Sequence, residues 1–186
     1  KHTPHCLTMS ATPIPRSIAL SLYGHLDITN IFTLPKNRKL VKTWVIPESK
    51  RQSAYDWINK QIIHKNTQAF IVFPLIENSQ HESLKNVKAA TTEFQHLQKD
   101  VFPQLKLALL HGKMKSNEKD QIINDFKHKK YHLLISTTVI EVGIDIPNAN
   151  IIIIEGAERF GLAQLHQLRG RVGRGEDQAF CFLFSS

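Results

Sequence analysis

The chain has 186 residues, of which 41% are hydrophobic and 22% are charged, so it can bury a full core and is not a disordered or fibrous protein. Its formal net charge of +8 favours a polyanionic partner such as nucleic acid or a nucleotide, although solubility accounts for part of that charge. Only Cys6 and Cys181 are present, at opposite ends, which excludes a disulfide framework and indicates a reducing compartment; no apolar run approaches the ~20 residues of a membrane span.

The first 34 residues contain a short apolar run, a proline-rich turn and one helical stretch. Because one strand and one helix cannot bury their own apolar faces, we interpret residues 1–34 as the tail of a preceding domain. Residues 35–40, PKNRKL, are basic and begin with proline, which predicts a linker, and residues 41–186 form the next domain. The chain starts at Lys1 rather than Met, so we expect a piece of a longer protein.

From residue 41 onward, extended apolar runs alternate with helical patterns. We predict strands at 41–46, 69–73, 105–110, 133–135, 151–154 and 180–184, and helices from about residue 48, over 84–101 and around 116–126. Runs without polar alternation are typical of strands that are covered on both faces. The predicted fold class is therefore α/β, with a mostly parallel sheet and helices on both faces. Trp57 shares an apolar helical stripe, so we predict that it packs in the core rather than stacking on a base.

The segment from His111 to Lys115, HGKMK, is a basic loop directly ahead of a predicted helix whose cap we expect at Ser116 or Asn117. Such a loop suits a phosphate because the free N–H groups and the dipole of a helix N-terminus both favour an anion. A solvated surface turn is an equally good interpretation of the loop taken by itself.

Two further loops are candidate ligand sites. Residues 136–145 follow a buried run, where a parallel strand delivers its loop to a crevice. In residues 170–174, GRVGR, glycines flank Arg171, and Arg174 follows three residues later. Glycine allows close approach of the backbone and arginine offers a planar fork for phosphate oxygens, so an anionic, polyphosphate ligand is implied. We expect both arginine side chains to face the surface that the strand-end loops line.

The chain lacks a phosphate-binding G-x-x-x-x-G-K-[ST] loop and an acidic strand end that could hold magnesium. By itself it is therefore not expected to hydrolyse ATP. We also predict no metal site, because the one metal-like pair, His128 and His132, has no acidic or cysteine partner at the right spacing.

Five segments, in this order, resemble the motifs of superfamily 2 helicases, and within them the RecG family of bacterial ATP-dependent DNA helicases: SATPIPR, FPLIENS, HGKMKSNEKD, TTVIEVGIDIPNA and AERFGLAQLHQLRGRVGRG. The resemblance covers residues 5–184. Transcription-repair coupling factors share the first and last segments and are the alternative within the superfamily. A catalytically silent nucleic-acid-binding module is the alternative from another class.

The resemblance implies that residues 41–186 are the second, C-terminal RecA-like domain of such a motor, which clamps ATP against a first domain. Arg171 and Arg174 match the arginine fingers that offset charge on the γ-phosphate. Gln167 matches the polar residue that begins the same motif. Gly143 and Asp145 match the positions near the nucleotide sugar.

The same resemblance assigns Thr137 and Thr138 to the DNA backbone, together with His111 and Gly112. The segment formed by Ser10, Ala11 and Thr12 matches the motif that couples the nucleotide state to the DNA path. A hydroxyl-rich turn that caps a helix is the other interpretation of this segment.

The implied function is the C-terminal half of an ATP-driven double-stranded DNA translocase or helicase that remodels branched DNA and stalled replication forks in DNA repair and recombination. The implied ligand is ATP with Mg²⁺, bound mainly by the N-terminal RecA-like domain of the same chain. The implied partners are branched or forked DNA and that domain, without a membrane. The implied location is the bacterial cytoplasm, in association with the nucleoid.

Overall fold

The computed structural model describes residues 29, 39–74, 90–136 and 146–185. The chain divides into two compact units, Lys1–Lys36 and Asn37–Ser186, and almost all of the first lies outside the described residues. The segment Ser10 to Thr12 therefore lies outside them too. The boundaries expected for the tail, the linker and the second domain stay a prediction.

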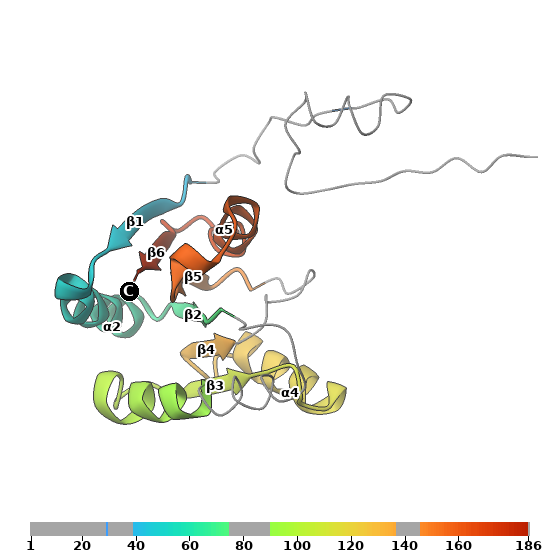
Figure 1. Ribbon diagram of the computed structural model, residues 1–186. Helices are drawn as coiled ribbons and strands as arrows, with labels where there is room; N and C mark the ends of the chain where they lie inside the picture. Colours follow the sequence, from blue (N-terminus) through green and yellow to red (C-terminus); the bar gives the residue numbers. More distant parts are fainter. Residues whose placement is uncertain (1–28, 30–38, 75–89, 137–145, 186) are drawn as a thin grey trace, which may run out of the picture. The chain divides into compact units, whose positions relative to one another are not determined.

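The second unit is built on one six-stranded sheet, with the strand order β1-β6-β5-β2-β4-β3 (Figure 1). Every neighbouring pair is parallel. All carboxyl ends therefore lie at one edge of the sheet, the carboxyl edge, and all amino ends lie at the opposite, amino edge. The predicted α/β fold with a parallel sheet is confirmed. The strands are β1 (Lys42–Ile46), β2 (Gln68–Val72), β3 (Leu107–Leu110), β4 (Leu133–Ser136), β5 (Ala149–Ile154) and β6 (Phe180–Phe184).

Helices cover both faces of the sheet, as predicted (Figure 1). On one face, α2 (Arg51–Lys65) and the helical segment 90–101, which ends in η2 (Leu97–Val101), pack on one apolar cluster. On the other face, α4 (Ser116–Lys127) and α5 (Leu162–Arg169) pack on a second cluster. The strands alternate between the two: in β2, Ala69 and Ile71 belong to the first cluster, whereas Phe70 and Val72 belong to the second.

Burial follows from this sandwich. All residues of β2, β4 and β5 are buried, which confirms that their continuous apolar runs are covered on both faces. β1 is the outermost strand on one side of the sheet and is mostly exposed. Trp57 is half-buried against the first cluster, with its ring edge-on to Phe180 at a centroid distance of 5.0 Å, so its predicted role in packing is confirmed.

The start of α4 differs from the prediction by one residue. Its N-cap is Lys115, with an extended backbone, rather than Ser116 or Asn117. The Lys115 N–H donates to Oε2 of Glu118 at 3.1 Å, so a carboxylate three residues into the helix completes the cap. A hydroxyl at the cap position is therefore not needed.

The end of α4 gives a prediction about stability. Lys129 has φ 59°, in the left-handed region that costs roughly 1–2 kcal/mol for a residue with a Cβ. We expect Lys129→Gly to be about 0.5–1 kcal/mol more stable than Lys129→Ala, because both remove the same charge and only glycine removes the strain. Urea titration measures the difference, and equal free energies of unfolding for the two variants would contradict it.

Candidate functional site

The arginine loop, residues 170–175, lies at the amino edge of the sheet. Gly173 has φ +73°, and a Cβ there would lie 3.0 Å from Cβ of Ala179 and 3.2 Å from Cγ2 of Val41. A Cβ on Gly175 would lie 3.1 Å from the carbonyl oxygen of Pro147. These three neighbours precede β6, β1 and β5 in the sequence. Gly173 is therefore required by both backbone conformation and close packing, and Gly175 by close packing.

Two guanidiniums share this loop. Arg171 is half-buried next to Val172, which is fully buried in the second core cluster. Burial lowers the pKa of Arg171, and the positive charge of Arg174, which is exposed, lowers that pKa further. Nε of Arg171 is buried without a hydrogen-bond partner, and no carboxylate of the described residues forms an ion pair with Arg171. Two neighbouring guanidinium groups favour an anion of several charges.

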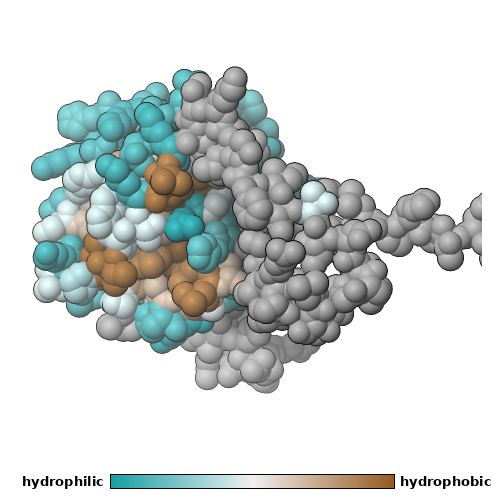
Figure 2. Space-filling model, turned by 90° about the horizontal axis from the view of Figure 1, so that it is seen from above, coloured by the Kyte–Doolittle hydropathy of each residue, from teal (hydrophilic) through white to brown (hydrophobic). Residues whose placement is uncertain are grey.

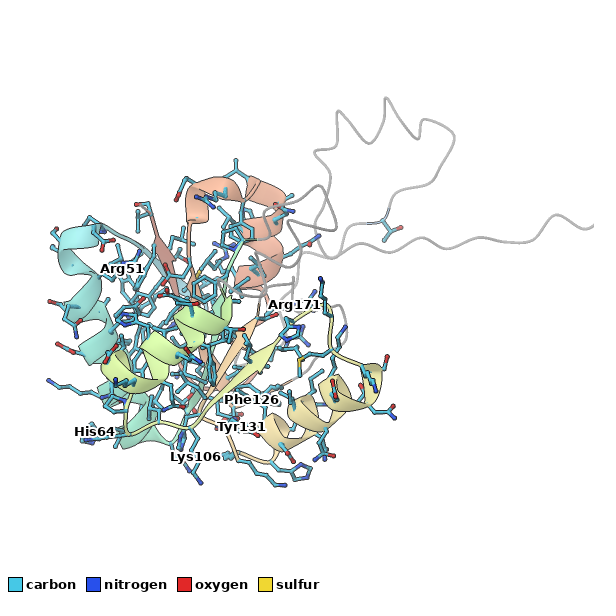
Figure 3. All side chains as sticks on the ribbon, turned by 60° about the horizontal axis from the view of Figure 1, so that its bottom comes forward. Arg51, His64, Lys106, Phe126, Tyr131 and Arg171 are labelled. Atoms are coloured by element: carbon cyan, nitrogen blue, oxygen red, sulfur yellow. The ribbon has the colours of Figure 1, made fainter. Side chains whose placement is uncertain are left out.

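Gln167 is exposed on α5, one turn ahead of the arginine loop. The Arg171 side chain lies on the side of the sheet that carries α4 and α5 (Figure 3). The structure thus brings Gln167, Arg171 and Arg174 into one short stretch around the end of α5.

His111 lies at the carboxyl edge. It follows Leu110, the last residue of β3, which pairs in register with Ser136, the last residue of β4. The carbonyl of Ser136 accepts a hydrogen bond from the N–H of Phe73 at 2.9 Å, so the ends of β2, β3 and β4 meet there. The carbonyl of His111 accepts from the N–H of Met114 at 3.2 Å, which closes a tight turn over the exposed Gly112.

The His111 ring is suited to an anion as a hydrogen-bonding group rather than as a cation. Burial lowers the pKa of His111 below its usual 6.5, and Lys119 lowers it further, so the imidazole is mostly neutral at pH 7. Nδ1 of His111 is buried and has no hydrogen-bond partner within the described residues. The positive charge around His111 comes instead from the nearby Lys113 and Lys119.

The remaining predicted site residues, Thr137, Thr138, Gly143 and Asp145, lie outside the described residues. The described chain stops at Ser136 on the carboxyl edge and resumes at the buried Ile146, close to the amino end of β5.

The arginine loop lies at the opposite edge of the sheet from His111 and Gly112. That both arginine side chains face the surface lined by the strand-end loops stays a prediction. α5 begins after the carboxyl end of β5 and runs back across the sheet, so the loop after α5 reaches the amino edge. His111 and Gly112 lie at the carboxyl edge. Among the described residues, the structure therefore separates Arg171 and Arg174 from His111 and Gly112.

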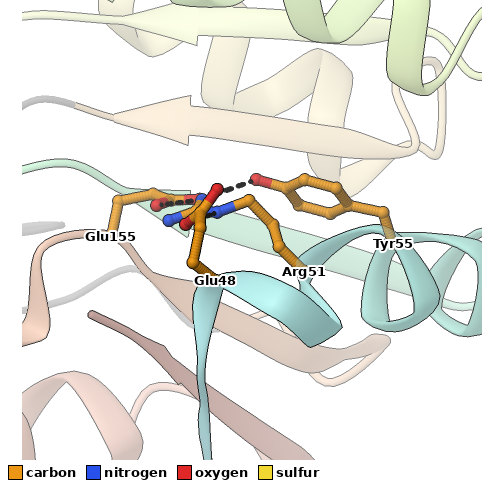
Figure 4. A network of polar contacts seen from close by, with 4 residues as sticks. All are labelled: Glu48, Arg51, Tyr55 and Glu155. Carbon is orange, nitrogen blue, oxygen red and sulfur yellow. Dashed lines mark hydrogen bonds and ion pairs between the residues drawn. The ribbon is translucent and has the colours of Figure 1, made fainter. Parts of the chain in front are cut away.

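A buried polar network at the carboxyl edge was not predicted from the sequence (Figure 4). Nη1 of Arg51 donates to both carboxylate oxygens of Glu155, at 2.9 and 2.7 Å, and the Tyr55 hydroxyl donates to Oε1 of Glu155 at 2.8 Å. Nε of Arg51 donates to Glu48 at 2.8 Å, and the guanidinium carbon lies 4.7 Å from the centre of the Phe184 ring. The one signal in the sequence was an acidic residue directly after the apolar run of β5.

The electrostatics of this network are those of a strong ion pair. Burial acts to lower the pKa of Arg51, but the hydrogen bond and charge of Glu155 outweigh burial and raise that pKa. Burial, followed by the charge of Glu155, raises the pKa of Tyr55. The network joins the start of α2 to the end of β5, directly before Gly156, where the chain turns towards α5.

Within the described residues, no group of three or more histidine, cysteine, aspartate or glutamate side chains could hold a metal ion. His128 and His132 have separate partners: Nδ1 of His128 contacts the carbonyl of Asn124 at 2.8 Å, and Nδ1 of His132 accepts from the N–H of Lys106 at 2.9 Å. No helix in the described part of the chain is long and apolar enough to cross a membrane.

Residues 53–176 match the family described as the helicase conserved C-terminal domain. The ATP-dependent DNA helicase RecG of Thermotoga maritima is 52% identical over 177 residues, which are 95% of this chain and 22% of that protein. RecG of Aquifex aeolicus is 51% identical over 180 residues, which are 97% of this chain and 22% of that protein. The chain thus spans 22% of the length of these two relatives.

Among solved structures, RecG bound to a three-way DNA junction matches with a TM-score of 0.76 and 49% identity, covering 95% of this chain and 22% of that chain. Domain 2 of the DEAD-box helicase Mss116p, bound to an RNA duplex, matches with a TM-score of 0.58 and 22% identity. That match covers 78% of this chain and 54% of the other, and it shows the fold alone. The predicted resemblance to RecG helicases and the predicted RecA-like fold are confirmed.

Proposed function

The chain belongs to the family of helicase conserved C-terminal domains, and from this premise we propose that it is the second motor domain of an ATP-driven DNA translocase. In this proposal the complete protein moves along double-stranded DNA and remodels branched DNA and stalled replication forks, in the bacterial cytoplasm at the nucleoid. The relatives that support this proposal are themselves named ATP-dependent DNA helicases, and one of them was solved on a three-way junction.

The observation that carries the proposal is the pair formed by Arg171 and Arg174. Burial lowers the pKa of Arg171, and the positive charge of Arg174 lowers that pKa further. Within the described residues Arg171 has no counter-charge, and Gly173 keeps the backbone between the two arginines free of a side chain. A polyphosphate relieves this repulsion and fits the planar, forked donors of arginine. The residues present therefore fit the phosphates of ATP.

In the proposed pocket Arg171 and Arg174 act as arginine fingers against charge that develops on the γ-phosphate. Gln167 also contacts the nucleotide, and Gly143 and Asp145 approach its sugar. ATP binds with Mg²⁺, and we assign the phosphate loop and the magnesium ligands to an N-terminal RecA-like domain of the same protein. That domain is the direct partner of this chain.

His111 and Gly112, at the carboxyl edge, hold the DNA backbone together with Thr137 and Thr138, through hydrogen bonds to phosphate that position the duplex without reading its bases. The segment Ser10 to Thr12 couples the two sites. Closure of the domains around ATP brings the arginines onto the phosphates while this domain grips DNA. Hydrolysis opens the clamp, and the domain grips again further along.

The test uses the complete protein with a three-way junction that carries one labelled strand. We expect the junction to stimulate ATP hydrolysis and the labelled strand to be displaced only when ATP is present. DNA binding without ATP hydrolysis would instead support a silent nucleic-acid-binding module. Strand displacement that needs a stalled RNA polymerase would support a transcription-repair coupling factor.

A further inference from the structure

We propose that the corner of the domain where β3 and β4 begin is a second DNA-binding surface, which takes the phosphate backbone of a separate duplex arm. We call it the basic corner and define it by Lys106, Lys127, Lys129, Lys130 and His132. The inference rests on the proposed function, because it needs a protein that works on branched DNA. It concerns the amino edge of β3 and β4, away from both His111 and the arginine loop.

The backbone of the basic corner is held in place by hydrogen bonds. The N–H of His132 donates to the carbonyl of Lys106 at 2.8 Å, and the N–H of Lys106 donates to Nδ1 of His132 at 2.9 Å. Buried Gln68 donates through Nε2 to the carbonyls of Phe126 and Tyr131, at 2.7 Å each. Lys106 and Tyr131 lie close together at this corner (Figure 3). The lysine side chains therefore project from a fixed turn.

The charge of the corner is not balanced within the described residues. Lys130 pairs with Asp125 at 2.8 Å, whereas Lys106, Lys127 and Lys129 form no ion pair with a described residue. The negative end of the α4 dipole stabilises a cation in the last turn of the helix, and Lys127 is the one cation there. The dipole therefore does not explain the presence of the other lysines. Like charges gathered in this way repel one another, and a bound polyanion offsets that repulsion.

His132 adds a neutral donor. Because its Nδ1 accepts a backbone N–H, the neutral ring carries its hydrogen on Nε2, which can donate to a phosphate oxygen. Its pKa is lowered by burial and then by Lys106, so the ring is mostly neutral at pH 7. The corner thus combines point charges with one directional hydrogen-bond donor.

A nucleic acid fits this surface better than a protein does. Protein interfaces need buried apolar or aromatic anchors, whereas phosphate contacts need only cations and donors. Within the described residues the large exposed hydrophobic side chains all lie elsewhere: Leu40, Trp44, Val45, Ile63 and Leu162. Figure 2 shows hydrophobic residues on the face seen from above, the side on which β1 and α5 lie in Figure 1.

The basic corner and the His111 loop are at opposite ends of α4. That helix has 12 residues, so its ends are about 18 Å apart. Glu118 and Asp120 are exposed on the helix between the two ends and oppose a single duplex lying along it. A second arm of a branched substrate reaches the basic corner without crossing these carboxylates.

The test is the complete protein with the triple change Lys106→Gln, Lys127→Gln and Lys129→Gln, which leaves the pair of Lys130 and Asp125 intact. Binding to a three-way junction and to a linear duplex is measured between about 50 and 200 mM salt. We expect the junction Kd to rise about tenfold and the slope of log K against log salt to fall by about 2–3 in magnitude. The Kd for linear duplex and the ATPase rate without DNA should stay unchanged.

The matched control is Lys50→Gln, Lys60→Gln and Lys65→Gln, which removes the same charge from exposed positions on or next to α2, on the other face of the sheet. The proposal is overturned by an unchanged junction Kd, by an equal loss in the control, or by an equal loss for linear duplex. An ATPase defect with normal DNA affinity would mark the basic corner as a protein contact and overturn the proposal too.

If the glutamine variant misfolds, Lys→Arg at the same three positions must keep wild-type junction binding. Absence of DNA-stimulated ATP hydrolysis in the unchanged protein would overturn the proposed function instead.

Discussion

Arg174→Ala in the complete protein is expected to lower DNA-stimulated ATP hydrolysis by roughly 10³-fold or more, which is the scale of an arginine finger in phosphoryl transfer. Arg174 is exposed at the amino edge of the sheet, so its side chain is accessible to a nucleotide held by another domain. Its loss removes charge stabilisation in the transition state rather than substrate binding. The effect should therefore fall mainly on kcat, with a smaller change in KM.

Steady-state ATPase assays at saturating DNA measure this change, and DNA affinity should stay within about twofold because the proposed DNA contacts that the structure describes, His111 and Gly112, lie at the other edge. Arg169→Ala is the matched control: it removes an equal charge five residues earlier, in the last turn of α5, where Nη2 of Arg169 contacts Nδ1 of His166 at 3.1 Å. Arg174→Lys keeps the charge but loses the planar fork, so its rate should be intermediate. Wild-type turnover in Arg174→Ala would remove the finger assignment.

Most of the fold could be predicted because the strands carry a strong local signal. The run of four isoleucines in β5 is buried on both faces, and no helical or one-sided pattern competes with it. The start of α4 was less predictable, since Lys115 caps the helix through a carboxylate three residues away and not through its own side chain. Helix ends depend on such reciprocal contacts, which residue preference alone does not reveal.

For the candidate site, the sequence predicted residue types but not their placement. Glycines beside Arg171 indicated close backbone approach, and Gly173 does adopt a positive φ against Ala179. The edge on which this loop lies could not be read from spacing, because it depends on the direction in which α5 crosses the sheet. The partner of Glu155 was also out of reach, since Arg51 is 104 residues away in the sequence.

Glu155→Gln is the change with the largest expected effect on stability. The Glu155 side chain is 9% exposed and that of Arg51 is 25% exposed, and Nη1 of Arg51 donates to both oxygens of the Glu155 carboxylate. Removing one member of a buried pair leaves the other charge without compensation, which costs about 3–5 kcal/mol. Because Arg51 is partly exposed and keeps Glu48 as a neighbour, we expect a loss of about 3 kcal/mol, at the lower end of that range.

Two further variants separate the charge from the hydrogen bonds. Tyr55→Phe removes the hydroxyl that donates to Glu155 at 2.8 Å and should cost about 1–2 kcal/mol. The double change Arg51→Met with Glu155→Gln also removes the guanidinium that Glu155→Gln leaves unpaired. It should therefore recover much of the lost stability. A double variant that is less stable than Glu155→Gln would show that the guanidinium stabilises the fold through packing on Phe184 instead.

The loss should also be local, because Glu155 directly precedes Gly156, whose positive φ of 57° turns the chain towards α5 and the arginine loop. The backbone N–H of Glu155 donates to the carbonyl of Val72 at 2.9 Å. An unpaired Arg51 guanidinium beside residue 155 therefore disturbs the ends of β2 and β5 together. Hydrogen exchange should then accelerate at the carboxyl ends of β2 and β5 and in α5, with α4 protected as before. Uniform acceleration across the domain would mean that the pair stabilises the fold as a whole rather than this connection.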